Sequence, residues 1–338
     1  MKRKYFVIAS FVVIALFGYL FAFRKNEISI GSEQKGGLVI FSNNKKDELA
    51  KSLLTGLECA NASKRPIAVM MPSDIETRPL SGISQADLVL EMPVAPNGVT
   101  RAMAIFQCDV PKEIGSVRSA RDDFIPLAGG FKVIYAHWGG EHDALGKLNK
   151  GVVNNVDAMK YEGSTYYRKS SVPRPHNGFT TLERVYAKAS ELGYTLTDSF
   201  SGYPHEEKEN KRNLGTLVSN ISIPYPYPYN VTWTYNGQNK TYMRSRGNKA
   251  ETDRNDGSQV GAQVVVVMDT TSRFLREQYI EVKTQGSGSA HIYQNGTVIE
   301  GTWRKDPTKL DSKLFFYDLQ GKEIKFVPGK IWIEIVAQ

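Results

Sequence analysis

The sequence predicts an α/β or α+β domain and then a β-rich domain, a sandwich or a partly closed barrel, behind one N-terminal transmembrane helix. Three observations support this. An uncharged, mostly apolar run stands near the N-terminus, strand-like and helix-like runs alternate up to about residue 202, and strand-and-turn patterns fill the rest. With 338 residues, the chain is long enough for about two domains.

The apolar run YFVIASFVVIALFGYLFAF covers residues 5–23. As a helix it is roughly 28 Å long, close to the hydrocarbon thickness of a bilayer. No small-residue cleavage motif follows it, and the basic residues before it favour a cytoplasmic N-terminus. We therefore predict a cytoplasmic stub (1–4), a single-pass anchor in the cell membrane (5–23) and extracytoplasmic domains beyond it.

Composition divides the remaining chain into four parts. They are a polar stalk (24–53), an α/β ligand-binding domain (54–202), a charged linker (203–213) and a β-rich domain (214–338).

In the first domain, apolar runs of strand length alternate with helical patterns. Strands are expected at 65–71, 86–92, 101–107 and 131–138. Helices are expected at 121–130 and at 181–194, where Thr181 supplies a cap and Gly193 a stop. In the second domain, Asn295 and Gly296 predict a tight hairpin between two strands.

The formal net charge is +8, of which +5 remains outside the membrane once the three basic residues of the stub are set aside. A basic extracytoplasmic part suits anionic envelope polymers and head groups. No zinc-finger or RNP-type signature is present, so nucleic acid is not an expected partner.

The stretch EIGSVRSARDDF places Arg118 and Arg121 three residues apart. In a helix beginning near Ser116, capped by Ser116 or Ser119, both arginines share one face. A helix N-terminus with two guanidinium groups would hold an anion. The alternative is that the arginines pair with neighbouring carboxylates on a solvated face.

The stretch HWGGEH places His137 at a strand end, followed by the turn Gly139-Gly140. Strand ends of this kind hold ligands in open α/β sheets. Together with His176 of RPHNGF, His137 would serve as a general base or a metal ligand. The spacing matches no standard zinc motif, and pocket histidines often only hydrogen-bond, so we predict no metal.

Asp87 and Glu91 stand four residues apart in an apolar run, on the same face of a strand. They could act as paired acid–base carboxylates. We favour a structural role instead, as buried partners of Arg101, Arg118 or Arg121.

Cys59 lies before the strand at 65–71, and Cys108 follows the strand at 101–107. If these strands are antiparallel neighbours, the cysteines meet; if they are parallel, the cysteines lie too far apart for a bond. Both could also be small buried apolar residues. An extracytoplasmic location permits oxidation, so we predict a disulfide.

Several stretches together resemble the YerB-like family of bacterial cell-envelope lipoproteins, a family of unknown function. They are LTGL, RPIAVMM, RPLSGISQADLVLE, GVTRAMAIFQ, IGSVRSARDDFI, YAHWGG, PHNGFTT, YNVTWTY, VVVVMD, GSGSAHIYQNGTVIEGTW, FFYDLQGKEI and PGKIWIEIV. The resemblance runs from about Leu54 to Val336 and implies two fused extracytoplasmic domains. A transmembrane helix replaces the family's lipidated cysteine, and Glu141 departs from the family pattern.

No phosphate loop, serine-nucleophile elbow or dinucleotide glycine pattern is present, so no cofactor is expected and a binding protein is favoured over an enzyme. We predict that the first domain binds an anionic or carbohydrate cell-wall ligand. The candidate residues are Arg101, Arg118, Ser119, Arg121, His137, Gly139, Gly140, His176 and Asn177. Two alternatives stay open: a wall hydrolase or transferase with His137 or His176 as base, and a scaffold for a membrane or envelope partner protein.

Overall fold

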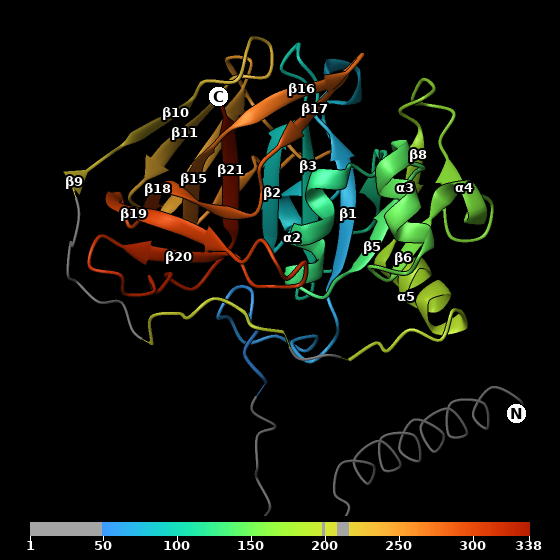
Figure 1. Cartoon of the computed structure of the whole chain (residues 1–338), viewed down its shortest axis with the longest axis horizontal. Coiled ribbons are helices and arrows are strands. Elements are labelled where there is room, and N and C mark those ends of the chain that lie inside the picture. The colour runs from blue at the N-terminus through green and yellow to red at the C-terminus, as the bar shows by residue number, and fades with distance from the viewer. Residues whose placement is uncertain (1–48, 198–199, 208–215) are drawn as a thin grey trace, which may run out of the picture. The chain divides into compact units, whose positions relative to one another are not determined.

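An eleven-stranded mixed sheet runs through the part of the chain that the computed structural model describes, residues 49–197, 200–207 and 216–338 (Figure 1). The strand order is β20-β19-β18-β15-β21-β2-β3-β1-β5-β6, and β9 pairs with β19. The bounds are β1 Ile67–Pro72, β2 Leu88–Pro93, β3 Thr100–Phe106, β5 Ile134–His137, β6 Asn155–Asp157, β9 Thr216–Leu217, β15 Val264–Thr270, β18 Gly286–Gln294, β19 Thr297–Lys305, β20 Phe315–Asp318 and β21 Ile331–Ala337.

The described residues also form three smaller sheets and seven short helical segments. One sheet holds β10 Asn220–Ile223, β11 Val231–Asn236, β12 Thr241–Arg246, β13 Lys249–Ala250 and β14 Gly261–Ala262; another holds β4 Ile114–Gly115, β7 Tyr167–Arg168 and β8 Gly178–Thr180; the third is the hairpin of β16 Ser272–Arg276 and β17 Tyr279–Val282. The helices are η2 Ile75–Thr77, η3 Ile83–Gln85, η4 Asp122–Phe124, α2 Ile125–Gly130, α3 His142–Asn149, α4 Ala158–Tyr161 and α5 Leu182–Glu191.

The predicted stub, anchor and most of the stalk lie outside the described residues. Among the residues that are described, no helix is long and apolar enough to cross a membrane.

The strands predicted for the first domain are confirmed as β1, β2, β3 and β5. β1 and β3 are antiparallel neighbours, with Ile67 opposite Phe106. This pairing brings the start of one strand to the end of the other, and Cys59 and Cys108 form the predicted disulfide with their Cα atoms 5.6 Å apart. The bond closes a loop of 49 residues, which lowers the entropy of the unfolded chain by an equivalent of about 4 kcal/mol.

The two predicted domains share the large sheet. β21, from the end of the chain, lies between β15 and β2 and runs parallel to both. The β-rich part is therefore not a self-contained sandwich, and the described strands form no closed barrel. Local patterns do not indicate this arrangement, because β2 and β21 are paired across more than 230 residues.

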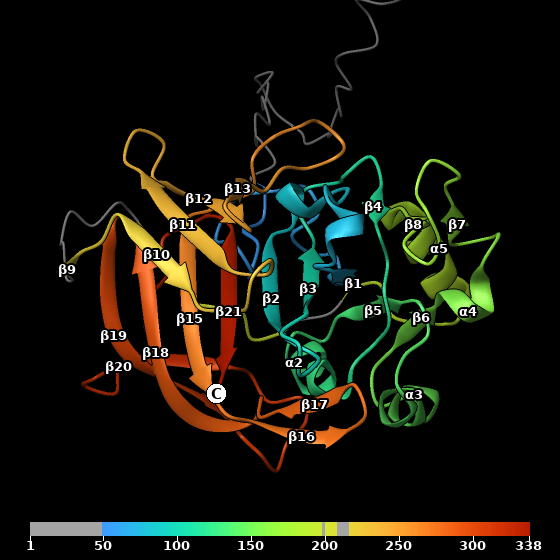
Figure 2. The same cartoon turned by 90° about the horizontal axis from the view of Figure 1, so that it is seen from above.

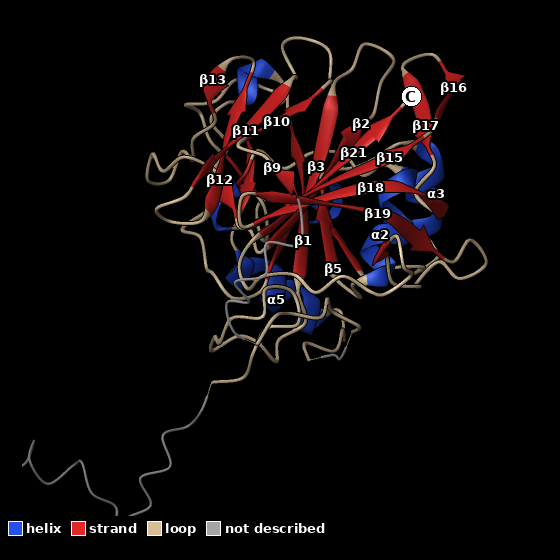
Figure 3. Ribbon diagram, turned by 90° about the vertical axis from the view of Figure 1, so that its left-hand side faces the viewer, coloured by secondary structure: helices blue, strands red, loops and turns tan. Residues whose placement is uncertain are grey.

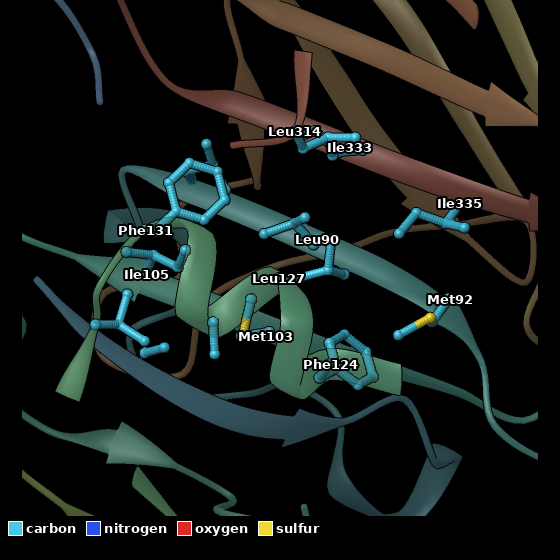
Figure 4. Packing of buried hydrophobic residues seen from close by; sticks show 14 of the residues in the cluster. Leu90, Met92, Met103, Ile105, Phe124, Leu127, Phe131, Leu314, Ile333 and Ile335 are labelled. Carbon is cyan, nitrogen blue, oxygen red and sulfur yellow. The ribbon is translucent and has the colours of Figure 1, made fainter. Parts of the chain in front are cut away.

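One face of the large sheet is covered by α2. Phe124, Leu127 and Phe131 on and beside this helix pack on alternate residues of β2 and β3, including Leu90 and Met103 (Figure 4). The alternation follows from the two-residue period of a strand, which sends every second side chain to this face.

The five-stranded sheet lies over the opposite face (Figure 3). Trp233 of β11 meets Trp332 of β21 edge to face, with ring centroids 5.3 Å apart. Figure 2 shows β10, β11 and β12 beside β15 and β21. Helix α5 covers another part of the same face, near β1 and β5, and Thr181 caps it as predicted.

A buried ionic network joins the two sheets. Arg244 of β12 donates hydrogen bonds from Nη2 to Glu91 of β2 at 2.7 Å and to Glu334 of β21 at 3.1 Å. Arg246 bonds both oxygens of Glu91, at 2.6 and 2.7 Å, and Glu251 pairs with both arginines. These charges tie the five-stranded sheet to the centre of the large one.

Candidate functional site

The stretch that joins β4 to η4 is extended, so the predicted helix beginning near Ser116 is wrong. Arg121 has the backbone angles of a strand, φ −129° and ψ 145°, and the helical turn starts only at Asp122. Neither Ser116 nor Ser119 caps a helix. The physical reason is that tertiary strand-like hydrogen bonds take up the backbone groups of this stretch.

Residues 117–120 fill a gap between the ends of two parallel strands. β1 and β5 pair directly only as far as Val69 and Ala136. Beyond that point, Arg118 donates its backbone N–H to Met70 O at 2.8 Å and accepts from Trp138 N at 3.0 Å. This places Arg118 at the carboxyl end of a parallel strand pair, where open α/β sheets hold ligands.

Three arginines and a histidine gather at this end of the sheet, and we call Arg101, Arg118, Arg121 and His176 the arginine cluster. Arg101 is 4% exposed, and its Nη1 lies 3.3 Å from Asp74 Oδ2. Burial first, and then the charge of Arg121, lowers the pKa of Arg101. Arginine nevertheless stays charged near neutral pH, so the cluster is cationic.

Four nitrogens of the arginine cluster are buried and have no hydrogen-bond partner among the described residues. They are Nε of Arg101, Arg118 and Arg121 and Nδ1 of His176. Within the described chain, Asp74 forms the only salt bridge to any of the three arginines. Unpaired buried donors are unfavourable, by about 1–3 kcal/mol each, and an anion would satisfy several at once.

His176 is neutral near pH 7, because burial first, and then the charge of Arg118, lowers its pKa. Its backbone oxygen accepts a hydrogen bond from Ser116 Oγ. Its ring can therefore donate a hydrogen bond without adding to the charge repulsion among the arginines.

His137 does not join the cluster. Its side chain is fully buried, Nδ1 lies 2.8 Å from Gly139 O, and Nε2 lies 3.1 Å from Asn155 Oδ1. Both ring nitrogens are occupied, so His137 holds the turn after β5 and leaves no free nitrogen for a ligand. Gly139 needs its left-handed φ of +61°, and a Cβ on Gly140 would lie 3.1 Å from Ala120.

The remaining candidates have structural neighbours of their own. Asn177 is buried and accepts from Arg168 Nη1 at 2.8 Å, while Ser119 is half-buried beside the cluster. Asp87 accepts the backbone N–H groups of Gln107 and Cys108, and burial raises its pKa to about 6.

Glu91 is a structural carboxylate, but its expected partners were wrong. It pairs with Arg244 and Arg246, which stand more than 150 residues away, rather than with the arginines of the cluster. Glu91 lies on β2, and Arg244 and Arg246 lie on β12. The alternation of side chains along each strand turns these three residues toward the space between the two sheets.

Sequence reasoning missed Asp74, which lies two residues after the end of β1 and pairs with Arg101. A carboxylate just beyond a buried strand was the available signal. It also missed Tyr279 of β17, whose ring lies 5.4 Å from the Arg121 guanidinium carbon. No local pattern indicates that contact.

Two hollows of the described surface, of about 640 and 280 Å³, are lined by residues outside the arginine cluster. The first is lined mainly by amides and hydroxyls, among them Asn239, Ser258 and Gln259. Their size alone assigns them no ligand.

Acidic groups beside the cluster give a pH-dependent prediction. Asp123 accepts Val282 N at 2.9 Å, and burial, followed by the charges of Glu141, Asp122 and Glu281, raises its pKa to about 7. The folded state therefore favours the protonated acid, and this stabilisation is lost as the pH rises from about 4 through 7. We expect Asp123→Asn to raise the free energy of unfolding by about 1–2 kcal/mol at pH 8 and by little at pH 4.

Urea unfolding of parent and variant at both pH values measures this difference. Asp306→Asn, at an exposed aspartate, is the control. A gain of equal size at pH 4 and pH 8 would contradict the prediction.

Two family models match the chain: "Protein of unknown function (DUF3048) N-terminal domain" over residues 54–195 and its C-terminal counterpart over residues 221–333. The Bacillus subtilis (strain 168) protein named "Putative lipoprotein YerB" is 30% identical over 293 residues, which are 85% of this chain and 86% of its own. The crystal structure of YerB protein from Bacillus subtilis aligns with a TM-score of 0.77 at 29% identity, over 86% of this chain and 97% of the other.

Proposed function

Because the chain belongs to the YerB-like family of DUF3048 proteins, we propose that it is an extracytoplasmic envelope protein that binds an anionic ligand at the arginine cluster. The observation that carries the proposal is the set of four buried, unpartnered nitrogens around Arg118. A phosphate or carboxylate group would supply the missing acceptors.

The location rests on three features. The relative is named a lipoprotein, a Cys59–Cys108 disulfide is present, and an apolar run of anchor length covers residues 5–23. Disulfides persist in oxidising compartments outside the cytoplasm. We propose a single-pass anchor with an extracytoplasmic domain, and anionic cell-wall polymer as the first class of ligand.

Catalysis has no specific observation in its favour. A histidine general base needs an accessible ring oriented by a carboxylate. His137 lies 3.8 Å from Asp157 but is fully buried, and Nδ1 of His176 has no hydrogen-bonded carboxylate in the part of the chain that the structure describes. A scaffolding role for the β-rich part is compatible with ligand binding and stays a separate prediction.

The test is retention of the detergent-solubilised full chain on immobilised poly(glycerol phosphate). We expect Arg118→Gln/Arg121→Gln to weaken binding at least tenfold, because each lost charge-assisted hydrogen bond contributes about 1.5–3 kcal/mol. The matched control, Arg184→Gln/Arg304→Gln, removes two exposed arginines and the same charge. Equal weakening by both double variants, or by neither, would overturn the site assignment.

A further inference from the structure

The β16–β17 hairpin, which meets the arginine cluster through Tyr279, carries exposed apolar side chains. Phe274 and Leu275 of the β16–β17 hairpin are 65% and 41% exposed, and Tyr279 of the same hairpin lies against Arg121. Ile75, 53% exposed, directly follows Asp74, the partner of Arg101. Desolvated cations and uncovered apolar groups thus lie at the same end of the sheet.

The hairpin is held in place beside the cluster. Asp123 accepts Val282 N at 2.9 Å, and Thr284 Oγ1 donates to Asp123 O at 3.0 Å. Arg276 at the hairpin turn forms a 3.2 Å ion pair with Asp143 of α3. These contacts fix the hairpin that carries Phe274 and Leu275 to η4 and α3.

The following inference rests on the proposed function. We propose that the ligand is an amphiphilic phosphate, that is, a phosphate ester with a hydrocarbon chain. The arginine cluster binds its charged group, and the hydrocarbon chain packs on Phe274 and Leu275. Charge complementarity selects the head group, because three arginines lie together while Asp74 is the one carboxylate in the described residues that forms a salt bridge with them. The uncovered apolar residues next to it select the chain, because burying both removes apolar surface from water.

A single amphiphile fits better than an anionic bilayer surface. Membrane-surface hairpins present free basic residues, whereas Arg273 pairs with Glu281 and Arg276 with Asp143. The unsatisfied nitrogens are instead buried within the cluster. They suit one phosphate group bound by several nitrogens of the cluster rather than a plane of head groups.

The experiment compares ethyl, butyl and octyl phosphate, all below their micellar concentrations, by isothermal titration. It uses residues 49–338 without detergent, because Glu48–Gln338 form one compact unit and the solved relative, aligned over 86% of this chain, is folded at that length. We expect octyl phosphate to bind about tenfold tighter than butyl phosphate. A tenfold gain in affinity corresponds to roughly half the transfer free energy of the four additional methylenes.

Phe274→Ser/Leu275→Ser is expected to abolish this chain-length gain and to leave ethyl phosphate binding unchanged. Leu319→Ser, at a 70% exposed leucine after β20, is the control and should keep the gain. Equal affinity for all three esters would overturn the inference while leaving the proposed anion site intact. A gain in affinity with chain length that survives in Phe274→Ser/Leu275→Ser would do the same.

Two other results separate the remaining possibilities. Binding of anionic vesicles without binding of any soluble ester would overturn the inference in favour of a membrane surface. If no phosphate compound binds, and Arg118→Gln/Arg121→Gln does not change retention on poly(glycerol phosphate), both the inference and the proposed function are overturned.

Discussion

Residues 49–207 are expected not to fold when they are expressed without residues 216–338, although the two family models divide the chain near this point. Without the second part, β2 loses its parallel neighbour β21 and exposes an apolar edge. Glu91 also loses both of its arginine partners and is left as an unpaired charge. Much of the core beneath α2 is lost as well, including Ile333 and Ile335.

Each part, purified alone, should show no cooperative unfolding transition and no near-ultraviolet circular dichroism. Refolding the two parts together from denaturant should restore both signals, because all the pairings of the large sheet become available again. A cooperative transition for residues 49–207 alone would show that the first part is an autonomous domain.

Replacing Arg244 with methionine is expected to lower the free energy of unfolding by about 3–5 kcal/mol. The side chain is fully buried between Glu91 and Glu334, and its guanidinium carbon lies 4.1 Å from the Trp332 ring centroid. Methionine fills much of the space but leaves Glu334 without a cation in direct contact. The deficit arises from the loss of this cation beside two carboxylates, Glu91 and Glu334, rather than from lost packing.

The pH dependence of this deficit follows from Glu91. Burial alone would raise the pKa of Glu91, but the charges of Arg246 and Arg244 outweigh burial and lower it to about 2. A lowered carboxyl pKa contributes stability above about pH 4.5 that is lost as the pH falls toward 2. The difference between parent and Arg244→Met should therefore be largest above pH 5 and shrink in acid.

Urea unfolding followed by tryptophan fluorescence measures both effects. Arg304→Met, at an exposed arginine stacked on Tyr317, is the matched control and should change stability by less than about 0.5 kcal/mol. Equal losses for the two variants would mean that the buried network adds nothing beyond an ordinary surface arginine.

Local patterns predicted the elements of the fold well. Asn295 and Gly296 form the expected two-residue hairpin loop, both with positive φ, and Thr181 caps α5. The disulfide could be predicted from the positions of two strands and the assumption that these strands are antiparallel. In each case the deciding interactions lie close in sequence or depend on a single pairing.

The stretch from Ser116 to Arg121 shows where such reasoning ends. Its serines and arginines satisfy the local rules for a helix start, yet Met70, Trp138 and Gly139 take up its backbone groups. Those partners can be identified only once β1 and β5 are known to separate at their ends. Arg118 and Arg121 nevertheless lie in one cluster with Arg101 and His176; that this cluster binds a ligand stays a prediction.

Because β21 lies in the middle of the large sheet, the sheet cannot be completed until β21 has been synthesised. Ile331–Ala337 is the last described strand in the chain, and 238 positions separate its first residue from Pro93 at the end of β2. At about 5–20 residues per second, synthesis takes roughly 10–50 s to cover that distance. Cys59 and Cys108 are both made early, so their bond can form before the sheet is complete. During that interval the edge of β2 that pairs with β21 lacks this partner.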